Sequence, residues 1–126
     1  MKPTEAQVEE RLPVWKALSE FFLDTDLQPK ELEQIAQSLA ATNYSEQRLE
    51  EFLNFEVCVA CRWNIFSGRW GGFEDGWLRK KIISYYDWMP WLKKVHILRH
   101  RSMYERYWNI VKPRISQIRA QKINLC

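Results

Sequence analysis

Hydrophobic residues recur along most of the chain at the three- and four-residue spacing that is typical of an amphipathic helix. A stripe near the N-terminus is formed by Val8, Leu12, Trp15, Leu18 and Phe22. The most regular stripe, near the C-terminus, is formed by Tyr104, Trp108, Val111, Ile115 and Ile118. Alternation of apolar and polar residues, the pattern of a half-buried strand, is scarce. The pattern therefore predicts an all-α fold.

Further helices are predicted between these two stripes. Pro29 suits the first turn of a second helix, and Ser45 suits the N-cap of a third helix that extends to Cys61. A fourth helix is expected over residues 77–85, and Pro90 can open another that reaches residue 98. We therefore expect a single compact domain of five or six helices that spans residues 1–126.

Two prolines fall within these helical stripes, where an interior proline costs about 3 kcal/mol. We expect Pro13 to lie in the first turn of its helix, or in a short turn that precedes it. Pro113 predicts a kink or a break in the last helix near Asn109.

The composition indicates a globular protein rather than a membrane or secreted protein. A chain of 126 residues with 46% hydrophobic and 28% charged residues suits one globular domain with its own core. No apolar run reaches the ~18 residues of a membrane span, and the opening MKPTEAQVEE lacks the apolar segment of a secretory signal. Three cysteines in such a chain indicate reduced thiols. We expect a cytoplasmic protein without membrane association.

The net charge of +3 conceals an uneven distribution of charge. Residues 1–61 contain five basic and twelve acidic residues, a net charge of −7, whereas residues 62–126 contain fourteen and four, a net charge of +10. The two halves could attract one another within the fold. Alternatively, one half could present a patch of a single sign that steers a partner toward the protein.

All four glycines lie in the segment GRWGGFEDG, residues 68–76. This segment matches neither the GxxxxGK[ST] nor the GxGxxG phosphate-binding motif, and Glu74 and Asp75 would repel a phosphate at the start of the following helix. Two interpretations stay open. The segment is either a helix connection whose aromatic rings are anchored in the core, or a loop that uses Trp70 and Phe73 to bind a partner.

The strongest candidate for a metal site combines Cys58 and Cys61 with His96 and His100. Each pair shares one helix face, and together they could offer Zn²⁺ four N/S ligands. However, the 34 residues between the pairs match no compact zinc finger, and Cys61 lies on an apolar stripe, where a free cysteine packs as a small hydrophobe. We expect these residues to pack rather than bind metal, and we expect no cofactor.

No combination of residues in the sequence is typical of a catalytic site. The segment HILRH lacks the glutamate that a zinc protease motif requires. Acid pairs such as Glu50 and Glu51 are adjacent on a helix surface, which is typical of a solvated face rather than of a general acid and base. We therefore expect no enzymatic activity and no catalytic residues.

Nucleic-acid binding is an alternative function, because basic and aromatic residues interleave near the C-terminus. The basic residues are Arg99, Arg101, Arg106, Lys112, Arg114, Arg119 and Lys122. On a helix these charges divide between the two sides of the apolar stripe, as they do on an ordinary solvated helix. Tyr104 and Trp108 belong to the core by their spacing.

The segments VWKALSEFFLDTDL (residues 14–27) and FEVCVACRWNIFSGRWGGFEDGWL (residues 55–78) resemble a small bacterial all-helical family that is similar to toxin immunity proteins. The matching positions are Trp15, Asp24, Thr25, Glu56, Val57, Asn64, Trp70, Gly72, Phe73, Trp77 and Leu78. The resemblance implies a non-catalytic protein that binds a cognate protein toxin and blocks it.

In such a complex, the acidic half would cover a basic cleft of the toxin. The candidate residues for charge are Asp24, Asp26, Glu31, Glu50 and Glu51. Trp70 and Phe73 are the candidate aromatic anchors.

Overall fold

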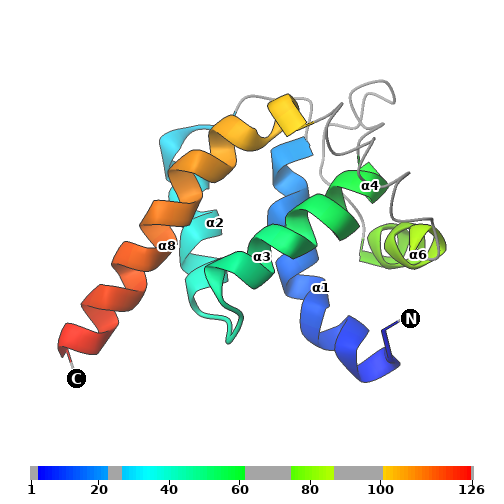
Figure 1. Cartoon of the computed structure of the whole chain (residues 1–126), viewed down its shortest axis with the longest axis horizontal. Coiled ribbons are helices and arrows are strands. Elements are labelled where there is room, and N and C mark those ends of the chain that lie inside the picture. The colour runs from blue at the N-terminus through cyan, green and yellow to red at the C-terminus, as the bar shows by residue number, and fades with distance from the viewer. Residues whose placement is uncertain (1–2, 23–26, 62–74, 87–100, 126) are drawn as a thin grey trace.

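The computed structural model describes residues 3–22, 27–61, 75–86 and 101–125, and each regular element within these ranges is a helix (Figure 1). The prediction of an all-α fold is confirmed. The helix that was expected between Pro90 and residue 98 lies outside the described residues, as do residues 68–74 of the glycine-rich segment.

The first helix, α1, spans Glu5–Ser19 and is followed by a short 3₁₀ helix, η1 (Glu20–Phe22). The Thr4 hydroxyl accepts from the Gln7 N–H at 3.2 Å while the Gln7 side chain accepts from the Thr4 N–H at 2.9 Å, which forms a capping box. Pro13 lies inside α1, so the prediction that it begins the helix is wrong. Its ring is exposed, and burial of Val14 and Trp15 offsets the lost hydrogen bond.

The second helix, α2, spans Pro29–Ala40 and begins at the proline that the sequence indicated. The Glu31 carboxylate accepts from the Gln28 N–H at 3.2 Å and so satisfies one of the free amide groups at this end. The apolar stripe of α2 is buried as its spacing predicts. It comprises Leu32, Ile35, Ala36 and Leu39.

The third predicted helix consists of three consecutive segments: α3 (Glu46–Phe52), the π-helical turn η2 (Leu53–Val57) and α4 (Cys58–Cys61). Ser45 is the N-cap, as expected, and its hydroxyl accepts from the Arg48 N–H at 3.1 Å. A π turn is wider than an α turn and changes which residues face the core. Within η2, Phe55 is exposed and Glu56 is buried.

The remaining described elements are α6 (Asp75–Tyr85), the 3₁₀ helix η3 (Arg101–Met103) and α8 (Glu105–Leu125). Leu78 and Ile82 of α6 are buried, as the predicted fourth helix requires. Helix α8 continues through Pro113, so the predicted break near Asn109 is wrong. Pro113 is exposed, and the neighbouring Val111 and Ile115 are fully buried against the rest of the domain.

Helix α8 packs along α2, whereas the α3–α4 segment crosses α1, and α6 lies against α1 and α4 (Figure 1). The side chains that fill the space between these helices form one continuous apolar core. Trp15, Leu18 and Leu49 are completely buried within it. This arrangement places the basic helix α8 directly against the acidic helices α2 and α3.

Candidate functional site

The interface of α8 with α2 and α3 joins the two oppositely charged parts of the chain. Arg114 of α8 and Glu33 of α2 form a two-pronged pair, with Nε to Oε1 at 2.7 Å and Nη2 to Oε2 at 2.9 Å. The Arg114 hydrogen bonds lower the pKa of Glu33, and Glu33 in turn raises the pKa of Arg114. At this interface, the interpretation that the two oppositely charged halves attract one another within the fold is confirmed.

Two further ion pairs connect α8 to α3. The Glu50 carboxylate accepts from Trp108 Nε1 at 2.6 Å and from Lys112 Nζ at 3.3 Å. Arg119 Nη1 lies 3.3 Å from a carboxylate oxygen of Glu46. Glu50, a predicted partner-binding residue, is therefore bonded to α8 within the protein.

Two of the other residues predicted to contact a partner through their charge, Glu31 and Glu51, lie on different helices. Glu31 caps the start of α2, and Glu51 of α3 lies 3.3 Å from Arg48. The Glu51 side chain is 45% exposed and its partner is 43% exposed, so this pair faces solvent. The predicted contacts Asp24, Asp26, Trp70 and Phe73 lie outside the described residues.

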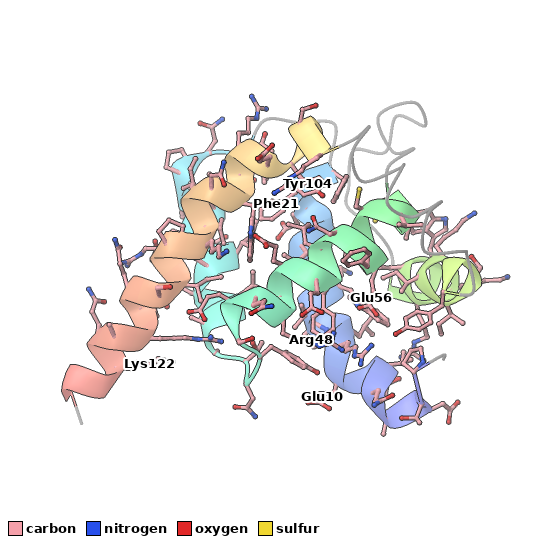
Figure 2. All side chains as sticks on the ribbon, in the orientation of Figure 1. Glu10, Phe21, Arg48, Glu56, Tyr104 and Lys122 are labelled. Atoms are coloured by element: carbon pink, nitrogen blue, oxygen red, sulfur yellow. The ribbon has the colours of Figure 1, made fainter. Side chains whose placement is uncertain are left out.

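Most of the described basic residues that suggested nucleic-acid binding have partners within the protein. Besides the pairs to Glu33, Glu46 and Glu50, Arg101 pairs with Glu105, and Arg106 donates to the Tyr107 hydroxyl at 3.0 Å. Lys122 is exposed near the end of α8 (Figure 2), and Arg99 lies outside the described residues. Internal pairing reduces the positive potential that α8 can present to a phosphate backbone.

The aromatic residues that interleave with these charges, on α8 and in the turn that precedes it, pack inward. Tyr104 and Trp108 are buried, as their spacing predicts, and Tyr107 is buried with them. The Tyr107 ring stacks on Phe21, with 5.8 Å between the ring centres. A stacking surface for bases requires exposed rings, and these three rings do not provide one.

The side chains of Cys58 and Cys61 are both buried. Burial raises the pKa of the Cys61 thiol, so the thiolate that a metal or a nucleophilic reaction needs is disfavoured. His96 and His100 lie outside the described residues. Within the described ranges, no group of three or more His, Cys, Asp and Glu residues could hold a metal ion.

A buried charged cluster joins η2 to α1, and the sequence patterns did not indicate it. Glu56 accepts from Arg11 Nη1 at 3.1 Å and from Trp15 Nε1 at 2.9 Å, and the Arg11 and Glu56 side chains are only 10% and 7% exposed. Figure 2 shows Glu56 on the segment that crosses α1. Glu56 and Trp15 are two of the positions on which the sequence-based expectation of an immunity-like family rests, and the structure brings these two together.

A shallow groove lies between α8 and the start of α2, and its lining combines apolar residues with the charged residues Glu33, Arg106 and Arg114. It contains two adjoining hollows of about 360 Å³ and 270 Å³, both of which are lined by Pro29, Leu32 and Ile110. The Ile110 side chain is 56% exposed. The sequence analysis missed this surface. The available signal was that Ile110 is a large apolar residue that falls off the buried stripe of α8.

The chain belongs to the family described as a domain of unknown function (DUF7079), whose model matches residues 9–114. This range includes α1 from Glu9 onward, the interhelical ion pairs up to Arg114 and the Arg11–Glu56 cluster. No curated protein and no solved structure matches the chain. Among the helices that the structure describes, none has the length and apolar character needed to cross a membrane.

Proposed function

We propose that this member of the DUF7079 family is a non-catalytic binding protein, and specifically an immunity protein that binds and blocks a cognate bacterial toxin. The resemblance of residues 14–27 and 55–78 to immunity-like proteins supports the proposal. The inhibition is steric and electrostatic: acidic side chains cover a basic cleft that the toxin otherwise uses for its own substrate.

The observation that carries this proposal is that some carboxylates of the acidic helices α2 and α3 bind α8, whereas another faces solvent. Glu33, Glu46 and Glu50 bind the basic helix α8. Glu51, on the same helix as Glu46 and Glu50, instead faces solvent together with Arg48. The acidic half therefore holds the domain together and also keeps a carboxylate available at its surface.

Glu51 is the best supported of the predicted contacts. An exposed ion pair such as Glu51–Arg48 is worth about 0–1 kcal/mol, so a cation of a partner can replace Arg48 at little cost. Glu50 is less available, because a partner would have to break its bonds to Trp108 and Lys112. Glu31 is half-buried and also caps α2, which leaves part of its carboxylate for a partner.

Two buried ionisable groups of the described ranges, Glu56 and Cys61, are poorly placed to act in catalysis. Glu56 is bonded to Arg11 and Trp15 in the interior rather than facing a cleft. The Cys61 thiol is held in its protonated form by burial. Neither arrangement offers an accessible general base or nucleophile.

The decisive experiment is co-expression with the product of the neighbouring reading frame, which the proposal expects to be the toxin. The wild-type chain should rescue growth, and the Glu51→Lys variant should bind the purified toxin with a slower on-rate, because charge steering acts on association. Glu105→Lys is the matched control: Glu105 is 46% exposed, pairs with Arg101 one turn away and undergoes the same charge change. Absence of rescue by the wild-type chain would reject the proposal, and equal on-rates for both variants would reject Glu51 as a contact.

Nucleic-acid binding by the basic C-terminal helices is the alternative. Its support is the net charge of +10 over residues 62–126, although the described part of α8 uses much of its charge internally. Such binding would weaken steeply as the salt concentration rises. Titration with duplex DNA and with RNA at two salt concentrations tests it, and no binding at low salt would exclude it.

A further inference from the structure

The exposed Arg48–Glu51 ion pair of α3 is fixed to the core on its basic side. The central carbon of the Arg48 guanidinium lies 4.5 Å from the centre of the Phe52 ring, and Phe52 is almost fully buried. The Tyr44 ring packs edge-on against the same ring, with 4.9 Å between the ring centres. The face of an aromatic ring attracts a cation. Arg48 is therefore held in place by a contact that does not depend on Glu51.

The Phe52 ring also connects this surface pair to the buried charged cluster. The central carbon of the Arg11 guanidinium lies 5.0 Å from the ring centre, and Arg11 is bonded to the buried Glu56 at 3.1 Å. Phe52 thus packs against one cation that is buried and one that reaches solvent. A side chain that packing has already ordered loses little conformational entropy when a partner binds it. Arg48 is therefore a pre-organised contact.

Any partner that binds Glu51 also meets Arg48. Arg48 Nη1 lies 3.3 Å from Glu51 Oε2, and the two residues are three positions apart on one side of α3. A partner cation that takes the Glu51 carboxylate comes close to the Arg48 guanidinium, which Phe52 keeps nearby. Two such cations repel one another, and the repulsion grows as water leaves the contact. A cleft that carries basic residues alone is thus a poor match for this surface.

We propose that Arg48 and Glu51 bind the toxin together, and that the cleft of the toxin carries a carboxylate beside the basic residue that pairs with Glu51. The toxin carboxylate accepts from the Arg48 guanidinium, whose planar fork can donate two parallel hydrogen bonds to a carboxylate. One ion pair within this protein is replaced by two ion pairs across the interface. The inference rests on the proposed function and adds the chemistry of the partner at the same site.

A contact that uses both signs of charge is selective. Discrimination between partners depends on a repulsive element as well as an attractive one. Arg48 repels a basic protein that lacks the carboxylate, and Glu51 repels a phosphate backbone. The pair therefore favours a protein with adjacent acidic and basic side chains over a nucleic acid and over basic proteins in general.

Binding kinetics with the purified product of the neighbouring reading frame test this inference. If Arg48 only competed for Glu51, Arg48→Gln would release an acidic contact and tighten the binding of a basic toxin. The proposal instead expects Arg48→Gln to raise the dissociation constant about tenfold or more, mostly through a faster off-rate, because the toxin carboxylate loses its donor. Arg48→Glu should weaken binding further, because it places two carboxylates against each other.

Arg101→Gln is the matched control. The Arg101 side chain is 48% exposed, against 43% for Arg48, and it pairs with Glu105 rather than with an acid of α3. This variant should leave the off-rate unchanged. Binding is compared at a temperature at which circular dichroism shows each variant to be folded. Equal or tighter binding by Arg48→Gln, or the same loss in Arg101→Gln, would overturn the inference alone. Absence of binding by the wild-type chain would reject the proposed function as well, so the two failures are distinguishable.

Discussion

The guanidinium group of Arg119, on α8, donates to the carbonyl oxygen of Tyr44 at 2.6 Å, just beyond the end of α2. The same group also donates to the carbonyl oxygens of Thr42 at 3.1 Å and Ala40 at 3.3 Å. The last carbonyl groups of a helix have no partner within the helix. A side chain that is distant in the sequence therefore caps α2 and fastens it to α8.

Replacement of Arg119 by Met should destabilise the protein by about 1–3 kcal/mol, because it leaves several partly buried carbonyl groups without a donor. Urea unfolding at neutral pH measures this loss. Lys122→Met removes a positive charge from an exposed site of the same helix and should change the stability by less than about 0.5 kcal/mol. Equal effects of the two substitutions would contradict the capping role.

The Glu33–Arg114 pair should make stability depend on pH in the acid range. The Arg114 hydrogen bonds lower the pKa of Glu33 below its usual 4.5. A group whose pKa is lower in the folded state adds stability above its unfolded pKa, and this stability is lost as the pH falls through the folded value. The difference in unfolding free energy between wild type and Glu33→Gln should therefore shrink as the pH falls below 4.5. A difference that is constant from neutral to acid pH would contradict this assignment.

Glu56→Gln should be among the most destabilising single substitutions in the described part of the chain. It removes the counter-charge of the buried Arg11, and breaking a buried ion pair from one side costs about 3–5 kcal/mol. Thermal unfolding should show a large decrease in melting temperature. Glu51→Gln, which breaks an exposed pair on the adjoining helix, is the control and should cost less than about 1 kcal/mol. Similar losses for both would show that the Arg11–Glu56 pair contributes little.

The thiols of Cys58 and Cys61 should be protected from alkylation in the native protein. Both are buried, and burial raises the pKa of Cys61, so little thiolate is available to react. Iodoacetamide at neutral pH followed by peptide mass spectrometry should find both residues unmodified until urea is added. Rapid modification of either residue in the native protein would contradict this burial, and stoichiometric zinc in the purified protein would contradict the expectation of no metal site.

Local patterns in the sequence predicted most of the described helices. The three- and four-residue spacing of Trp15, Leu18, Val111 and Ile115 identified residues that the structure buries. Pro29 and Ser45 marked helix starts correctly, because the first turn of a helix needs few amide donors and favours a side-chain cap. The rule that a proline lies in the first turn of a helix or before it was wrong for Pro13. Here the packing of the core outweighs the loss of one hydrogen bond.

The sequence by itself therefore determined the helical class, the apolar faces and the division of charge between the two halves. Only the tertiary structure decided which charges meet. It paired Glu33 with Arg114, placed Arg119 over the end of α2 and enclosed Glu56 with Arg11. The physical reason is that helix periodicity is a local property, whereas an ion pair between distant residues depends on how whole helices pack. The same packing left Ile110 exposed beside a groove that no local pattern could indicate.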